Sequence, residues 1–134
     1  MAATSRGDAL GKLVLRLTLG VLMLFHGVAK LINPAYLDYI NKQVIEAGLP
    51  HYVAFGVYIG EVVAPLMIVL GVFARFGGAI VAINMMFAVV LSHSAQLLTL
   101  TKSGGWALEL QAFYLLCGIA VALLGSGRLA LRPD

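Results

Sequence analysis

Ionisable side chains occur inside stretches of this sequence that are otherwise long and apolar. Five of them carry groups that can bind or transfer protons: His26, Lys30, Glu61, His93 and Glu109. An ionised group inside the hydrocarbon of a membrane costs at least about 2.5 kcal/mol unless it is paired or hydrated. A carboxylate held away from water beside an imidazole can take up and release protons. These residue types point to proton transfer, and we predict catalytic roles for Glu61, Lys30, His26 and Glu109.

The first apolar run, Leu13–Ile32, keeps its polar groups on one side. At about 100° per residue, one arc of about 120° contains Arg16, Gly20, Met23, His26, Gly27 and Lys30. A rise of about 1.5 Å per residue requires about twenty positions to cover a hydrocarbon core of about 30 Å. We therefore expect a spanning helix whose polar stripe faces partner helices. Arg16 lies about 21 Å from Lys30 along this helix, and it is either an anchor at the membrane boundary or, with His93, a cofactor-binding residue.

Turn signals place the other helices. A short amphipathic helix is expected between Asn33, which can cap it, and the stop signals Gly48 and Pro50. It would lie on the membrane surface, as a lid over the bundle or as a plain connector. Three further spanning helices are expected, with a short connection at 75–77 between the first two: about Val53–Ala74, Gly78–Leu98 and Trp106–Leu124. The predicted fold is all-α, a bundle of four transmembrane helices with one interfacial helix, in a single domain over residues 1–134.

The composition is typical of an integral membrane protein. The 134 residues are 61% hydrophobic and 11% charged, with a mean hydropathy of +0.98, which leaves too little charge to cover a soluble domain. The net charge is +3, but the basic residues are scattered singly, so we expect no nucleic-acid partner. Cys117 is the only cysteine, which excludes an intrachain disulfide.

The basic residues also indicate an orientation. One side of the predicted membrane receives Arg6, Lys12, Arg75, Arg128 and Arg132, and the other receives Lys42 and Lys102. Because cytoplasmic segments carry an excess of Lys and Arg, both termini are expected in the cytoplasm. The five proton-transfer candidates then fall in the outer half of the membrane, where Lys30 can form a neutral pair with Glu61 or Glu109. The Glu-x-x-His pairs of di-metal bundles do not occur, so we expect no metal.

Several spaced motifs resemble a known family. They are Arg16-x-x-x-Gly20, His26-Gly27-x-x-Lys30, an acid at Glu61, Leu70-Gly71-x-x-x-Arg75, Trp106-x-x-Glu109 and Gly125-x-Gly127. In this order they are similar to the DoxX family of small four-helix membrane proteins, with a departure at the tail Leu131–Asp134. The resemblance implies membrane redox chemistry, since relatives include the small membrane subunit of thiosulfate:quinone oxidoreductase and membrane partners of superoxide-detoxifying and sulfurtransferase enzymes. It also marks Arg16, His26, Lys30, Glu61 and Glu109 as residues of interest.

Two hypotheses from different functional classes follow. In the first, the chain is an inner-membrane protein of a bacterial cell that binds a quinone or a similar lipophilic redox partner, while a separate soluble enzyme supplies electrons. Lys30 or His26 would hydrogen-bond a carbonyl oxygen, and Glu61 and Glu109 would move protons. In the second, the buried charges specify helix packing, and the chain is a non-catalytic membrane anchor that docks a soluble enzyme. A small-solute carrier is a weaker third hypothesis, because alternating access would require a homo-oligomer.

Overall fold

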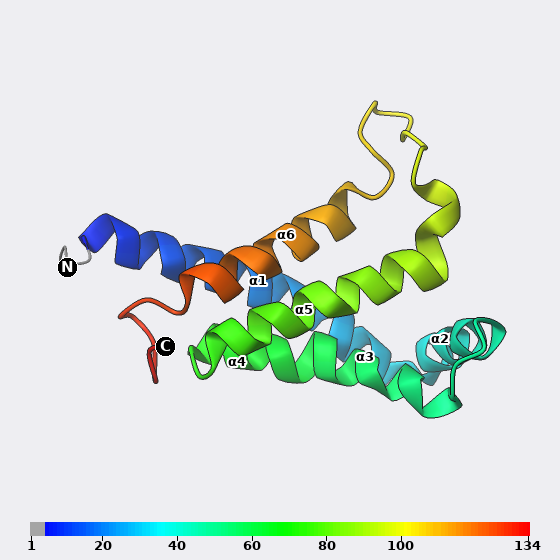
Figure 1. The fold of residues 1–134 in the computed structure, drawn as a ribbon, viewed down its shortest axis with the longest axis horizontal. Helices are drawn as coiled ribbons and strands as arrows, with labels where there is room; N and C mark the ends of the chain where they lie inside the picture. Colours follow the sequence, from blue (N-terminus) through cyan, green and yellow to red (C-terminus); the bar gives the residue numbers. More distant parts are fainter. Residues whose placement is uncertain (1–4) are drawn as a thin grey trace.

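The chain folds into a bundle of long helices (Figure 1). A computed structural model describes residues 5–134. Its helices are α1 (Arg6–Ile32), α2 (Pro34–Glu46), α3 (Gly56–Tyr58), α4 (Ala64–Leu70), α5 (Ala74–Ala88) and α6 (Glu109–Leu124). Shorter turns extend them: the 3-10 turns η1 (His51–Phe55) and η4 (Ser94–Gln96), and the π turns η2 (Ile59–Val63) and η3 (Val89–His93). Over residues 5–134 there are isolated β-bridges but no strand, so the all-α prediction is confirmed.

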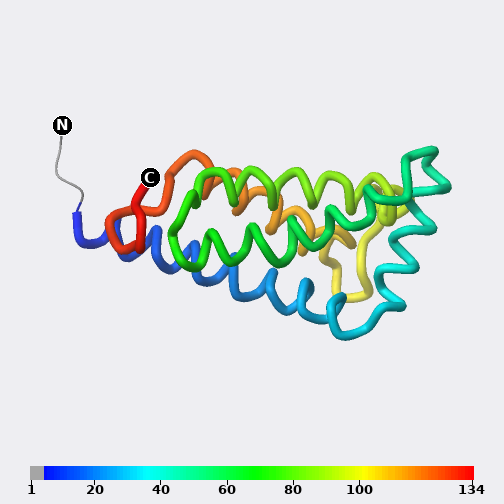
Figure 2. Tube along the Cα trace, turned by 90° about the horizontal axis from the view of Figure 1, so that it is seen from below, coloured from blue at the N-terminus to red at the C-terminus, as the bar shows by residue number. Residues whose placement is uncertain are grey.

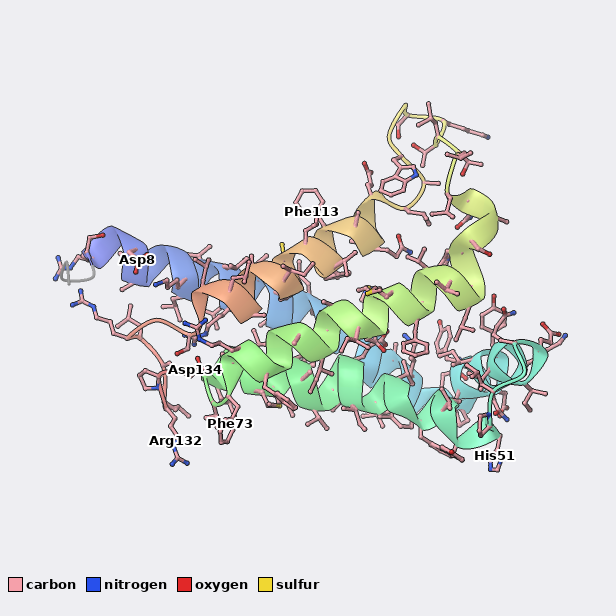
Figure 3. The ribbon with its side chains drawn as sticks, viewed as in Figure 1. Asp8, His51, Phe73, Phe113, Arg132 and Asp134 are labelled. Carbon is pink, nitrogen blue, oxygen red and sulfur yellow. The ribbon has the colours of Figure 1, made fainter. Side chains whose placement is uncertain are left out.

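Three helical segments are long and apolar enough to cross a membrane. They are Arg6–Ile32, His51–Leu70 and Ala74–Gln96. The remaining apolar helix, α6, is shorter at 16 residues. Large apolar side chains are exposed along the outside of the bundle, and Phe113, which is 71% exposed, points away from it (Figure 3). A soluble protein rarely exposes so much apolar surface. The prediction of a membrane protein with transmembrane helices is therefore confirmed.

Asn33 separates α1 from α2, as predicted. Its backbone N–H closes the last turn of α1, and its side-chain Oδ1 accepts a hydrogen bond from the backbone N–H of Ala35 at 3.1 Å. Pro34 occupies the first turn of α2, where a missing N–H costs nothing. Gly48 follows α2 with a φ of +81°, a conformation that favours glycine and stops a helix. The short helix expected in this region is present.

The turn between α4 and α5 lies earlier than predicted. Gly71, with a φ of +71°, ends α4, and Phe73, with a φ of +51°, precedes α5. The expected connection at 75–77 is wrong, because a left-handed glycine interrupts the helical hydrogen bonds before that point. Arg75 instead lies in the first turn of α5, where its guanidinium donates to two carbonyl oxygens at the end of α6.

The start of α6 also differs from the prediction. Trp106 does not begin the helix. It pairs with Leu100 in an isolated antiparallel bridge, and its indole N–H donates to the carbonyl of Leu97 at 2.9 Å. Because these contacts fold the loop 97–108 back on itself, the helix begins only at Glu109.

Glycines allow the helices to approach closely. A Cβ on Gly78 of α5 would lie 2.5 Å from the carbonyl oxygen of Gly118 of α6, and one on Gly118 would lie 2.8 Å from that of Gly78. Gly20 and Gly27 bring α1 against the segment 59–70 in the same way. Small residues at such crossings let membrane helices pack through van der Waals contact. Figure 2 shows the result, with α1, α4 and α5 running side by side along the bundle.

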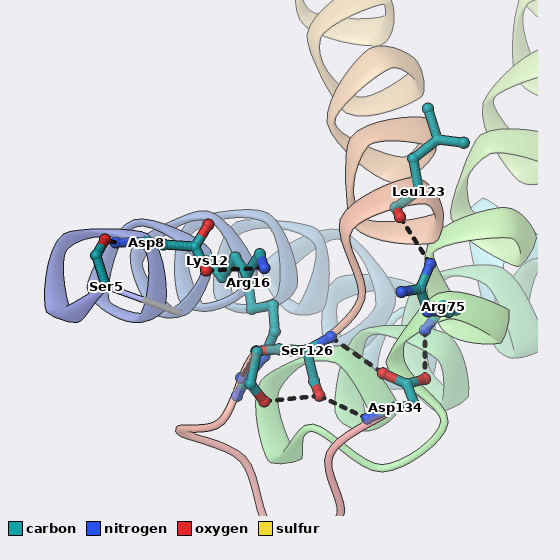
Figure 4. A network of polar contacts seen from close by, with 9 residues as sticks. Ser5, Asp8, Lys12, Arg16, Arg75, Leu123, Ser126 and Asp134 are labelled. Carbon is teal, nitrogen blue, oxygen red and sulfur yellow. Dashed lines mark hydrogen bonds and ion pairs between the residues drawn. The ribbon is translucent and has the colours of Figure 1, made fainter. Parts of the chain in front are cut away.

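Residues 125–134, after α6, fold back over the α4–α5 turn. We call this segment the tail, and we call the end of the bundle that it covers the tail end. The backbone N–H groups of Leu131 and Arg132 donate to the carbonyls of Leu70 and Gly71, both at 3.1 Å. Arg16 of α1 is buried beneath the tail, at 1% exposed. Its guanidinium donates to four backbone carbonyls, those of Ile68, Val69, Ser126 and Leu129. Arg16 therefore joins α1, the end of α4 and the tail (Figure 4).

Asp134 fastens the other side of the tail. Its carboxylate accepts hydrogen bonds from the backbone N–H of Arg75 at 2.9 Å and of Ser126 at 3.0 Å (Figure 4). Partial burial alone would raise the pKa of this carboxyl, but the hydrogen bonds and the charge of Arg75 together hold the pKa below its ordinary value. The ionised form is therefore the one that the folded tail favours.

Attachment of the tail is expected to depend on pH through Asp134. Because the pKa is lower in the folded protein, Asp134 stabilises the attached tail above about pH 3.9, and this contribution is lost as the pH falls through the folded pKa. Asp134→Asn should therefore reduce amide-exchange protection of Leu131 and Arg132 at neutral pH, and its difference from wild type should shrink in acid. Hydrogen exchange corrected for intrinsic rates measures this. Equal protection of variant and wild type at neutral pH would contradict it.

Candidate functional site

A cavity of about 510 Å³ lies at the opposite end of the bundle from the tail, beside α2. Most of its lining is apolar, and its polar lining includes Lys30, Glu61, Asn84, His93, Gln111 and Tyr114. His26 also lines it. Small-molecule sites usually have volumes of about 300–1,000 Å³ and a few polar groups within apolar walls. The structure therefore places four of the predicted site residues around one cavity: His26, Lys30, Glu61 and His93.

Lys30, Glu61 and Asn84 form a polar network from three helical segments. Lys30 Nζ donates to Glu61 Oε2 at 2.5 Å, and Asn84 Nδ2 donates to Glu61 Oε1 at 3.3 Å. Glu61 is 6% exposed, and an unpaired carboxylate at such a position would be costly. Of the two partners left open for Lys30 by the sequence, the structure shows Glu61.

Both π turns carry a polar residue of the cavity. Glu61 lies within η2, and His93 lies within η3. A π turn inserts an extra residue into the helical repeat, and such turns occur frequently at functional sites. His93 Nδ1 lies 3.0 Å from Gln96 Oε1, so one ring nitrogen already has a local partner.

Two glycines bring the network together. A Cβ on Gly27 would lie 2.1 Å from the carbonyl oxygen of Glu61, and a Cβ on Gly60 would lie 2.4 Å from the side-chain Cγ of Asn84. Neither position has room for a larger residue unless the backbone or the amide moves. The missing side chains therefore let α1 and α5 approach η2, which places Lys30 and Asn84 beside the same carboxylate.

His26 of α1 and Tyr114 of α6 meet at the wall of the cavity. Their ring centroids lie 5.6 Å apart with the planes at 86°, an edge-to-face contact. Tyr114 is 8% exposed, whereas His26 is exposed. This contact connects the first helix of the chain with the last one at the level of the cavity.

The helical segments that form the polar network match a known family. The sequence model of the family described as DoxX matches residues 11–94, more than half of the chain. The chain belongs to the DoxX family. No curated protein and no solved structure gives a match to this DoxX chain. The matched part runs from α1 into η4 and includes Lys30, Glu61 and Asn84, while α6 with Tyr114 lies beyond it.

Two predicted site residues of this DoxX protein lie away from the cavity. Arg16 is at the tail end, where its guanidinium binds backbone carbonyls. Glu109 is exposed at the start of α6 and lines a separate, shallower pocket of about 350 Å³ together with Trp106. Of the five residues expected together in the outer half of the membrane, four line the cavity, and Glu109 lies apart from them in the first turn of α6. Arg16 was expected to lie apart from these five.

The cavity lining also includes polar residues that were not predicted as site residues, among them Asn84, Gln111 and Tyr114. The sequence could have indicated Asn84, because an amide inside an otherwise apolar helix needs a hydrogen-bond partner. Gln111 and Tyr114 are spaced three apart, which puts them on one helix face, but nothing in the sequence shows which helix that face meets. Gln111 Oε1 is buried without a hydrogen-bond partner in the described chain. Over residues 5–134, no three His, Cys, Asp or Glu side chains come together to hold a metal ion.

Proposed function

We propose that this protein crosses the inner membrane of a bacterial cell four times, with both termini in the cytoplasm. The 16 residues of α6 extend about 24 Å, which a thin or locally thinned bilayer accommodates. Trp106 precedes this helix, and tryptophan is enriched at the headgroup level. Arg6, Arg128 and Arg132 are exposed at or near the tail end, which supports a cytoplasmic position for that end. The amphipathic α2 would then lie at the outer surface.

The cavity would bind the ring of a quinone or of a similar lipophilic redox partner. The observation that carries this proposal is the Lys30–Glu61 ion pair on the wall of a largely apolar cavity. Residues of the three long apolar helical segments line this cavity. The residues present fit such a ring, because apolar walls suit its faces and the Lys30 ammonium suits a carbonyl oxygen. Gln111 Oε1, which has no partner in the described chain, suits a ligand hydroxyl.

Lys30 and Glu61 would have different roles. Lys30 gives one N–H to Glu61, and its two remaining donors would hold a ligand oxygen and stabilise negative charge on it. Glu61 would take up a proton from the cavity or release one to it. Its Oε2 accepts the hydrogen bond from Lys30 Nζ at 2.5 Å, so the ammonium would stabilise the carboxylate after the proton is released. A bound quinone supplies two-electron redox chemistry, and the electrons would come from a separate soluble enzyme. His26 and His93, which line the same cavity, would exchange protons with the outer surface.

Glu61→Gln and Lys30→Ala are each expected to lower the bound quinone about tenfold or more, because each removes part of a charged hydrogen-bond pair. Quinone is extracted from detergent-purified protein and quantified by chromatography, with folding checked by circular dichroism. Glu46→Gln and Lys42→Ala make the same chemical changes at exposed positions of α2, and they should retain the wild-type content. Folded Glu61→Gln and Lys30→Ala proteins with as much quinone as wild type would overturn the proposal.

Arg16 supports a second candidate function, that of a non-catalytic anchor that docks a soluble enzyme. Its buried guanidinium donates to backbone carbonyls and holds parts of the chain together, and the pair between Lys30 and Glu61 would serve the same purpose in such an anchor. The experiment above distinguishes the two functions. An anchor would contain no quinone in any sample, and its Glu61→Gln and Lys30→Ala variants would lose folded protein.

A further inference from the structure

Some polar groups of the cavity already have hydrogen-bond partners within the protein, and others have none. Both carboxylate oxygens of Glu61 accept a hydrogen bond, one from Lys30 and one from Asn84. His93 has a partner in Gln96. None of the hydrogen bonds found among residues 5–134 involves the hydroxyl of Tyr114, which lines the same cavity. Tyr114 is 8% exposed as a residue, but its hydroxyl is not among the fully buried side-chain atoms that lack a partner. The hydroxyl is therefore accessible and available to a ligand in the cavity that Tyr114 lines.

Tyr114 is held firmly in the wall of the cavity. Its ring belongs to the buried core together with Met23 of α1 and Met85 of α5, and its edge-to-face contact with His26 limits its rotation. One turn later, Gly118 fixes α6 against α5 through a close backbone contact. A ring held by three helices keeps its hydroxyl in one place, which is what a binding group requires.

We propose that the Tyr114 hydroxyl is a ligand-binding group of this cavity and that it hydrogen-bonds an oxygen atom on the ring of the bound molecule. This assignment rests on the proposed function. A phenol hydroxyl both donates and accepts, so it would bind the carbonyl of a quinone and the hydroxyl of the corresponding quinol. The ligand class is therefore a ring that carries oxygen in either redox state, and a plain hydrocarbon would gain nothing from this residue.

Two probes with the same carbon skeleton test the assignment. Duroquinone and durene share a tetramethylated six-membered carbon ring, but only duroquinone carries the two carbonyl oxygens. Tyr114→Phe removes the hydroxyl and leaves the ring. Tyr58→Phe removes the same atom from a partly buried tyrosine of α3 that does not line the cavity. Binding is measured on protein in lipid nanodiscs, with empty nanodiscs subtracted, and folding is checked by circular dichroism.

The assignment predicts that Tyr114→Phe weakens duroquinone binding about three- to tenfold and leaves durene binding unchanged. Tyr58→Phe should match wild type with both probes. Equal duroquinone affinity in Tyr114→Phe and wild type would overturn the assignment while the proposed function stands. An equal loss for both probes would also overturn it, since the variant would then act through the shape of the cavity. If the wild-type protein itself does not bind duroquinone, the proposed quinone binding is wrong, and the assignment of Tyr114 fails with it.

Discussion

Arg16→Leu is expected to destabilise the folded protein by about 3 kcal/mol or more. The guanidinium is 1% exposed and donates to four backbone carbonyls. Leucine offers no donor, so carbonyls at the end of α4 and in the tail would remain buried without partners. Because Arg16 connects three parts of the chain, the same change should also release the tail from the α4–α5 turn.

Denaturation of the detergent-solubilised protein, followed by circular dichroism, measures this effect. Arg16→Lys should lower the free energy of unfolding less than Arg16→Leu does, because the lysine ammonium keeps the charge and some of the hydrogen-bond donors. It should still be less stable than wild type, because an ammonium lacks the planar fork that reaches all of these carbonyls. Arg128→Leu is a control, because Arg128 is exposed at the tail end and surface substitutions usually change stability by less than about 0.5 kcal/mol. If Arg16→Leu unfolds at the same denaturant concentration as Arg128→Leu, the role given to Arg16 is wrong.

Gly27→Ala is expected to lower the free energy of unfolding by about 1–3 kcal/mol or more. This is the second largest effect on stability that we predict, after Arg16→Leu. The added Cβ would lie 2.1 Å from the carbonyl oxygen of Glu61 and 2.6 Å from the carbonyl carbon. These are backbone atoms, so the new methyl group cannot be accommodated by rotating a side chain. α1 must move away from η2, and Lys30 would then move away from Glu61.

Gly11→Ala in the same helix is the matched control for Gly27→Ala. A Cβ on Gly11 would meet nothing within 4 Å, so alanine there should stabilise the helix by about 0.5–1 kcal/mol through its better helix propensity. Both variants are compared with wild type by denaturation in detergent, as for Arg16. Opposite signs are expected, and a Gly27→Ala protein as stable as Gly11→Ala would show that the α1–η2 contact is looser than described.

Much of the fold could be predicted from local sequence signals. The length of the run Leu13–Ile32 indicated the first spanning helix, and the pair Asn33 and Pro34 indicated where the next one begins. The error at the α4–α5 turn has a physical cause. The prediction of a helix over about Val53–Ala74 includes Gly71, although a glycine can equally adopt the left-handed conformation that ends a helix.

The candidate site was predicted in part. Helix periodicity put His26 and Lys30 on one face of α1, and the structure places both at the cavity with Glu61. Asn84 and Tyr114 could not be assigned to the cavity in this way, because periodicity shows the face of a helix but not its neighbour. The grouping of Glu109 with the cavity residues rests on its predicted depth in the membrane, and depth does not show the direction in which a side chain points.

The sequence by itself determined that this chain is an all-helical membrane protein of the DoxX type with buried charge in its first two apolar segments. These properties depend on composition and on short-range spacing, which local physics controls. Only the tertiary structure decided that Lys30 pairs with Glu61 rather than Glu109, and that Arg16 binds backbone carbonyls at the tail end. Pairing of residues far apart in the chain depends on how closely the helices approach, and that distance is set at Gly27 and Gly60, where even one methyl group would not fit.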